Sequence, residues 1–185
     1  MDKKLKKTDF VIQWLLCALL VFIDQITKHY VRFYLSGGKK IDIIKNVFCL
    51  QYLENRGSVW GILQGRISFL LIVTIVLLIL LMYLYIRIPK NVFYRPLLIL
   101  DVIMIAGAIG NTIDRVVFGY VTDFLYFELI NFPIFNFADC LITCVAVITI
   151  VFIMTRYKDV EFDFLRPTKS KSEKDNTDGK SDTHN

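Results

Sequence analysis

Four long apolar blocks constrain the fold of this chain more than any other feature of its sequence. They lie at about residues 10–35, 67–88, 96–117 and 139–154. An α-helix needs roughly 20 such residues to cross a bilayer. Hydrophobic residues also make up 55% of the 185 residues, which is a high share for a soluble domain. We therefore expect an all-α membrane protein with four transmembrane helices, formed as one domain by residues 1–157.

Two segments outside the blocks have their own character. Residues 41–53, in the loop after the first block, partly alternate in polarity and are rich in β-branched side chains. This pattern is typical of strands, so we expect a small extramembrane β element in the first outer loop. After Arg166 the chain has no large apolar residue. Such a segment cannot bury enough surface to offset its ordering entropy, so we expect residues 158–185 to form a largely disordered cytoplasmic tail.

The distribution of lysine and arginine indicates the orientation. Four spans place both termini on one side of the membrane. The N-terminal lysines, the 87–95 loop and the residues after 155 are basic. The positive-inside rule therefore places both termini in the cytoplasm, although the first outer loop is also basic. The N-terminus is similar to a signal peptide, but no small-residue cleavage site follows its apolar run, so we expect a retained first helix.

Composition also excludes several classes of site. Basic and aromatic residues do not interleave, so nucleic-acid binding is not indicated. The four cysteines are Cys17, Cys49, Cys140 and Cys144. Their spacing fits neither a disulfide framework nor a zinc motif, because no histidine lies near the Cys140/Cys144 pair.

Aspartates within the apolar blocks are the main candidates for function. A charge at the centre of a transmembrane helix costs on the order of 2.5–3.5 kcal/mol. If the third helix runs outward and the fourth runs inward, several charged residues gather at the outer face. They are Asp114, Arg115, Asp123 and Asp139. Asp101 would lie near the cytoplasmic interface and needs no special role.

Structural roles are open for most of these aspartates. Asp139 stands at a helix start and could be an N-cap. Asp114 could form an internal ion pair with Arg115 that stabilises the bundle. Asp24 could pair with Lys28 one turn later on the first helix.

Asp123 fits a structural role least well. It follows a helix end, where the helix dipole disfavours a negative charge. Two carboxylates in a half-buried site cannot both ionise cheaply, so one keeps a proton and the other acts as a base. Such a pair can activate water against an amide and protonate the leaving amine. The only histidines are His29 and His184, so a histidine-based triad at these aspartates is not indicated. We expect aspartic-type hydrolysis without metal or cofactor.

Five sequence blocks carry a family resemblance, in an order that follows the four spans. They are Asp24-Gln25-Ile26-Thr27-Lys28, Asn55-Arg56-Gly57-Ser58-Val59-Trp60-Gly61, Gly110-Asn111-Thr112-Ile113-Asp114-Arg115, Gly119-Tyr120-Val121-Thr122-Asp123-Phe124 and Phe132-Pro133-Ile134-Phe135-Asn136-Phe137-Ala138-Asp139. Together they resemble the signature blocks of lipoprotein signal peptidase (signal peptidase II), and the resemblance covers about residues 10–157.

The resemblance implies an aspartic endopeptidase of the bacterial inner membrane, active near the outer face. It would remove signal peptides from prolipoproteins whose cysteine carries a diacylglyceryl group, cutting just before that cysteine. Partners would be these substrates and membrane lipid, and we expect a monomer. The β element would correspond to the family's cradle over the substrate.

The same resemblance assigns roles to individual residues. Asp123 and Asp139 align with the catalytic pair. Positions expected to bind substrate or orient the pair are Asn55, Gly57, Asn111, Arg115 and Asn136. Positions expected to be structural or supporting are Asp24, Lys28 and Asp114.

The sequence departs from the family pattern in two places. Ser58 and Val59, followed by Trp60, stand where the family commonly has two alanines. Thr122 precedes Asp123 where valine is usual. These departures leave open the shape of the pocket near the lipidated cysteine.

Two other functions are compatible with buried carboxylates. Asp114, Asp123 and Asp139 could hold magnesium in a lipid-carrier phosphatase or phosphotransferase. A channel, transporter or assembly subunit could instead use them to line an ion path. An ion path needs polar residues through the bundle, whereas the second block up to Met82 has only Ser68 and Thr74.

Overall fold

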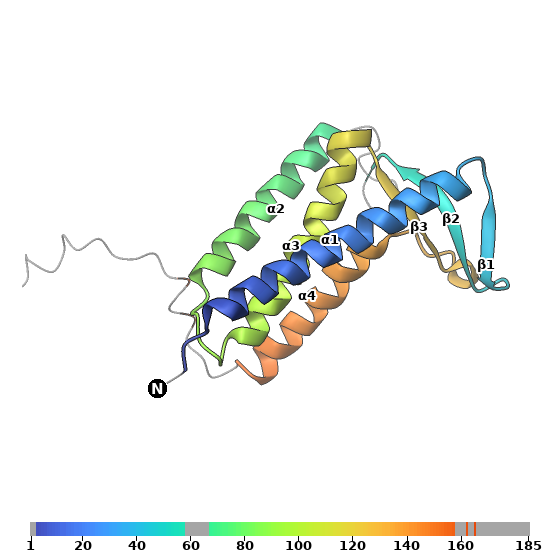
Figure 1. The fold of residues 1–185 in the computed structure, drawn as a ribbon. Coiled ribbons are helices and arrows are strands. Elements are labelled where there is room, and N and C mark those ends of the chain that lie inside the picture. Colours follow the sequence, from blue (N-terminus) through green and yellow to red (C-terminus); the bar gives the residue numbers. More distant parts are fainter. Residues whose placement is uncertain (1–2, 58–66, 158–161, 163–164, 166–185) are drawn as a thin grey trace, which may run out of the picture.

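The computed structural model describes residues 3–57, 67–157, 162 and 165. Its long helices are α1 (Lys7–Leu35), α2 (Ile67–Arg87), α3 (Arg95–Phe118) and α4 (Phe137–Thr155). All four are long and apolar enough to cross a membrane. In Figure 1 they form a bundle, with the strands at the end opposite the N-terminus. The predicted four-helix membrane fold is confirmed.

A three-stranded antiparallel sheet completes the fold. β1 (Lys40–Ile44) and β2 (Phe48–Asn55) form the predicted element between the first two spans, which is also confirmed. The third strand, β3 (Val121–Tyr126), lies between the third and fourth spans, where the sequence pattern predicts no strand, and it pairs with β2. A short 3₁₀ turn, η2 (Glu128–Ile130), follows it. The sequence does not indicate β3, because its partner lies about 70 residues earlier and short strands depend on tertiary pairing.

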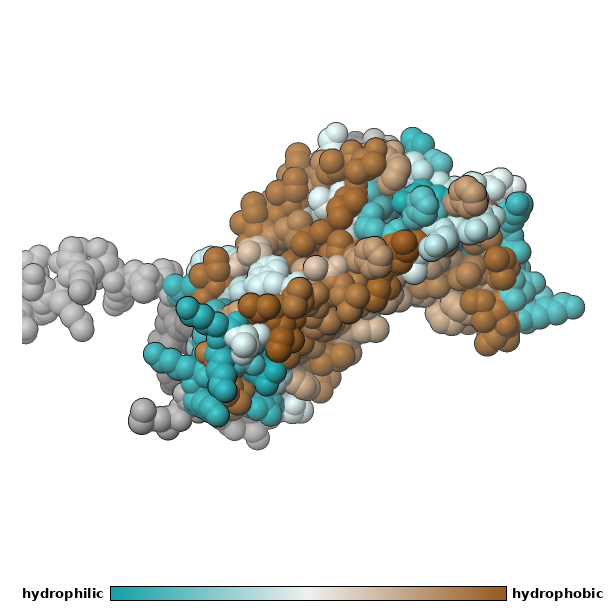
Figure 2. All heavy atoms as spheres, in the orientation of Figure 1, coloured by the Kyte–Doolittle hydropathy of each residue, from teal (hydrophilic) through white to brown (hydrophobic). Residues whose placement is uncertain are grey.

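α3 is the central helix of the bundle. In its most apolar 18-residue stretch 61% of the residues are buried, against 11–17% in the other three helices. Those helices turn many large apolar side chains outward, and the flank of the bundle is brown in Figure 2. Small residues allow α3 to approach its neighbours closely. A Cβ atom on Gly107, for example, would lie 2.8 Å from the carbonyl oxygen of Ala138.

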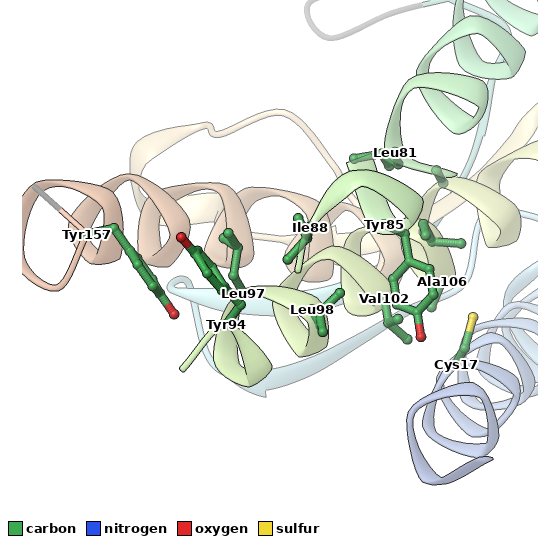
Figure 3. Close-up of a cluster of buried hydrophobic side chains, with 12 residues drawn as sticks. Cys17, Leu81, Tyr85, Ile88, Tyr94, Leu97, Leu98, Val102, Ala106 and Tyr157 are labelled. Carbon is green, nitrogen blue, oxygen red and sulfur yellow. The ribbon is translucent and has the colours of Figure 1, made fainter. Parts of the chain in front are cut away.

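A cluster of buried hydrophobic side chains, which includes Tyr85, Tyr94 and Tyr157, fills the bundle toward the end that carries the N-terminus (Figure 3). Tyr157, just after α4, is fully buried and stacks on Tyr94 with ring centroids 5.7 Å apart. Its hydroxyl donates to the carbonyl of Phe93 at 2.9 Å. These contacts attach the end of α4 to the start of α3. The expectations for residues 158–185 and for Ser58, Val59 and Trp60 fall almost wholly outside the described residues.

Candidate active site

The two aspartates singled out in the sequence face one cavity. Asp123 lies in β3 and is 1% exposed. Asp139 is the third residue of α4. Both line a cavity of about 620 Å³ at the sheet end of the bundle. The other candidate residues that line it are Asn55, Gly57, Asn111 and Arg115. The structure therefore brings together segments from β2, α3, β3 and α4.

Asn136 links the two aspartates. It is the N-cap of α4, and its side-chain oxygen accepts a hydrogen bond from the Asp139 backbone N–H at 3.0 Å. Asp139 Oδ2 accepts in return from the Asn136 backbone N–H at 3.1 Å, which completes a capping box. Because the amide oxygen is used in the cap, the amide nitrogen is free to donate to Asp123 Oδ1, at 2.6 Å. The N-cap is thus Asn136 rather than Asp139, and Asp139 serves both the cap and the site.

Two further asparagines complete the hydrogen bonding of the pair. Asn111 Nδ2 donates to Asp139 Oδ1 at 2.8 Å. Asn55 Nδ2 donates to Asp123 Oδ2 at 2.7 Å, and the Gly57 N–H donates to the Asn55 oxygen at 3.0 Å. Each of the four carboxylate oxygens therefore accepts one N–H from an uncharged amide. This arrangement fixes both carboxyl groups while leaving them able to bind a proton.

Burial and charge act strongly on Asp123. Burial away from water raises the pKa of this carboxyl to about 7, and the nearby charge of Asp139 adds to the increase. Hydrogen bonds from Asn55 and Asn136 oppose the shift because they stabilise the carboxylate. At neutral pH the pair can consequently hold one proton between its two members, as general acid–base chemistry requires.

The predicted supporting residues form a buried ionic network beside the pair. Lys28 Nζ lies 2.9 Å from Asp24 Oδ2, and both side chains are fully buried. The proposed pair between Asp114 and Arg115 is wrong. Asp114 instead lies 3.6 Å from Lys28 and 3.6 Å from Arg32. Consecutive helix residues do not face each other, which explains the difference.

Arg115 points in another direction from Asp114. Its NH1 atom lies 3.4 Å from the Thr74 hydroxyl of α2, and the residue lines the cavity. Its positive charge is thus available on the wall of the site.

Sequence reasoning missed two members of the network, Gln25 and Arg32. Gln25 Nε2 donates to Asp24 Oδ2 at 3.0 Å and to the Gly110 carbonyl at 3.1 Å. Arg32 NH1 donates to the Thr122 hydroxyl at 2.7 Å. Arg32 stands four residues after Lys28, and this helical spacing could have identified it as part of the same buried face.

The geometry does not favour a magnesium site at the aspartates. Among the described residues, one group of three metal-ligand side chains has its donor atoms within 4.8 Å of one another, namely Asp42, Cys49 and Glu128. These residues belong to the sheet region, and Lys40 Nζ already lies 3.1 Å from Asp42 and 2.6 Å from Glu128. Asp114 does not converge with the Asp123/Asp139 pair but is paired with two cations.

The chain is similar to known proteins over most of its length. The sequence model described as "Signal peptidase (SPase) II" matches residues 16–155. A lipoprotein signal peptidase of Caldanaerobacter subterraneus subsp. tengcongensis is 42% identical over 132 residues, covering 71% of this chain and 88% of that protein. One of Clostridium tetani is 39% identical over 145 residues, covering 76% and 90%.

A solved structure has a similar fold. It is described as "Bacterial membrane enzyme structure by the in meso method at 2.3 A resolution". It superposes with a TM-score of 0.74 at 31% identity, covering 88% of this chain and 97% of that one.

Proposed function

The chain belongs to the signal peptidase II family, and from that premise we propose that it is an aspartic endopeptidase that cuts diacylglyceryl-modified prolipoproteins just before the lipidated cysteine. Membership implies a multi-pass membrane protease that removes signal peptides from lipoproteins. The observation that supports the aspartic mechanism is the convergence of Asp123 and Asp139 on one cavity, linked through Asn136.

The proposed chemistry uses the pair as one unit. With Asp139 ionised, Asp123 keeps its proton up to about pH 7, as its raised pKa indicates. The ionised carboxylate accepts a proton from the water that attacks the scissile amide carbonyl. The protonated carboxyl donates its proton to the leaving amine. The C–N bond of the amide then breaks, and the C–O bond formed by the water remains. No metal or cofactor takes part in these steps.

The neighbouring residues position the reacting groups. Asn111 and Asn136 hold Asp139, while Asn55 and Asn136 hold Asp123. Arg115 supplies a positive charge on the cavity wall, where it would stabilise the negative charge that develops on the carbonyl oxygen. Gly57 orients Asn55 through its backbone N–H.

The surroundings suit a substrate that arrives within the membrane. Beside the polar groups, the cavity is lined by the apolar side chains of Leu53, Phe132, Ile134 and Ile142. A site at one end of a lipid-facing bundle can receive a substrate laterally, guided by its acyl chains and signal helix. We propose that the protein is a monomer in the bacterial cytoplasmic membrane, with both termini in the cytoplasm and the site near the outer face.

One incubation tests this function. The purified protein is mixed with a diacylglyceryl-modified prolipoprotein or with its unmodified precursor, and the products are identified by mass spectrometry. We expect cleavage of the modified substrate alone, with the lipidated cysteine as the new N-terminus. Equal turnover of both substrates would refute the lipid requirement. Failure to cut before the cysteine would refute the proposed function.

A further inference from the structure

Three charged residues follow one another at four-residue spacing on α1: Asp24, Lys28 and Arg32. Lys28 is fully buried. A buried charge is tolerated only when it is paired and hydrogen-bonded. The Lys28 ammonium has three N–H groups. It lies 2.9 Å from Asp24 Oδ2, 2.8 Å from the Asn111 oxygen and 3.6 Å from Asp114 Oδ2. The two shorter distances are within hydrogen-bond range and the third is an ion pair, so all of these contacts are directed into the protein.

Two of the three Lys28 partners lead to α4 and Asp139. Asp24 Oδ1 accepts the backbone N–H of Ala138, the residue before Asp139, at 3.0 Å. Asn111 contacts Asp139 itself. Because an ammonium group can only donate, the Asn111 oxygen must face Lys28, and its NH₂ group must turn away from it. That NH₂ group donates to Asp139 Oδ1 at 2.8 Å. Asn136 Nδ2 donates to the same Asn111 oxygen at 3.2 Å, so Lys28, at the shorter distance, and Asn136 together determine the orientation of an amide that holds the carboxyl group.

The third Lys28 partner leads to β3 and Asp123. Asp114 Oδ2 accepts the backbone N–H of Thr122, the residue before Asp123, at 2.8 Å. The pairing of β2 with β3 is irregular next to Asp123. Its register shifts between Leu50 and Leu53, and Leu53 is the partner of Asp123. Bonds from α1 and α3 therefore supplement the sheet at this point.

Arg32 adds a second link to the same strand. Its NH1 atom donates to the Thr122 hydroxyl at 2.7 Å and lies 3.6 Å from Asp114 Oδ1. Its guanidinium carbon also lies 4.2 Å above the centre of the Phe118 ring. Thr122 is fully buried.

We propose that Lys28 and Arg32 are positioning residues that hold α4 and β3 at the separation at which Asp139 and Asp123 act as one unit. The Thr122 hydroxyl is the contact by which Arg32 does this in the present chain. No residue of α1 is among those that line the cavity within the described part of the chain. Both cations therefore act through other residues and not on the substrate. The inference rests on the proposed function and extends it to the source of the site's geometry.

The first test uses Thr122→Val, Arg32→Met and the double variant. Valine keeps the shape of threonine and replaces only the hydroxyl with a methyl group, so Thr122→Val should fold. A misplacement of about 1 Å costs up to ~100-fold in rate. We expect kcat per folded molecule to fall by roughly 10- to 100-fold in Arg32→Met and by less in Thr122→Val. KM should stay within about twofold, because neither change touches the cavity. The double variant should be no slower than Arg32→Met, since the two residues act through one hydrogen bond.

The second test uses Lys28→Met and a pH profile. The charged groups that act on or contact Lys28 are Asp24 on α1, Asp114 on α3, Asp123 on β3 and Asp139 on α4. The Lys28 charge lowers the pKa of Asp123. Its removal should move the alkaline limb of the activity profile to higher pH, whereas a merely structural role would reduce activity equally at every pH.

Arg95→Met is the matched control. It removes an ion pair of 3.3 Å between Arg95 and Asp9 at the other end of α1, so its kcat should equal that of the wild type. Wild-type kcat in both Arg32→Met and Thr122→Val, in an enzyme that cleaves the lipidated substrate, would overturn this inference and leave the proposed function intact. A wild-type protein that cuts no lipidated substrate would overturn the proposed function instead.

Discussion

Gly110→Ala should destabilise the protein, although alanine is the better helix former. Gly110 lies on α3 against the buried carboxylate of α1. A Cβ atom there would lie 2.4 Å from Asp24 Oδ2 and 2.9 Å from Asp24 Cγ, too close for either atom to remain in place. The carboxylate cannot easily move away. Its Oδ2 is 2.9 Å from Lys28 Nζ, and its Oδ1 accepts the Ala138 N–H at 3.0 Å.

The size of the destabilisation follows from one favourable and two unfavourable contributions to the free energy of unfolding. Alanine gains about 1 kcal/mol over glycine inside a helix. Overpacking a tight contact costs about 1–3 kcal/mol, and the loss of a hydrogen bond to a charged group costs about 1.5–3 kcal/mol. The difference is a loss of roughly 1.5–5 kcal/mol in the free energy of unfolding. Because Asp24 holds the backbone before Asp139, cleavage per folded molecule should fall as well.

Thermal unfolding of the purified protein in detergent measures the first effect, and cleavage of a lipidated substrate measures the second. Val116→Ala is a suitable control on the same helix, because Val116 is 64% exposed. It should change the free energy of unfolding by less than about 0.5 kcal/mol. A Gly110→Ala protein as stable as the wild type, or more stable, would refute the reasoning.

Four further predictions concern the chemistry and the limits of the domain. Activity should fall as pH rises above about 7, because Asp123, whose pKa is raised to about 7, then loses the proton that the pair needs. Asn55→Ala removes an N–H that stabilises the Asp123 carboxylate, so the fall in activity should begin at a higher pH. A shift of this fall to lower pH would contradict the account. Chelation with EDTA should leave the rate unchanged, and loss of activity that magnesium or zinc restores would favour a metal mechanism. Deletion of residues 167–185 should preserve cleavage, because the family match ends at residue 155, and an inserted but inactive truncation would reveal a role for this segment.

The sequence predicts the membrane fold well because the length of an apolar block is a local property. The four spans and the β1–β2 element follow from such local patterns. β3 does not, because the Val121–Tyr126 segment becomes a strand only by pairing with β2, far away in sequence. Its prediction would need the tertiary fold first.

The site is predictable in part, because the positions of the four spans follow from the sequence. The topology of the spans alone brings Asp123 and Asp139 to one end of the bundle. It does not determine which hydrogen bonds their carboxyl groups accept, because these depend on how the asparagine amides are oriented by their own partners. Arg32 was missed since a single arginine near a helix end is usually interfacial. Only the packing of α1 against β3 shows that it reaches Thr122.

The central claim is that Asp123 and Asp139 together perform the cleavage. Its most direct test is the rate per folded molecule of Asp123→Asn, Asp139→Asn and the double variant, with Asp42→Asn on the exposed strand β1 as control. Asparagine keeps the shape of the side chain but cannot exchange a proton. Each single change should lower the rate by a factor of ~10² to 10⁴. The double variant should be little slower than either single one, because the two residues act as a unit. Asp42→Asn should match the wild type, and substantial activity in Asp123→Asn or Asp139→Asn would contradict the account.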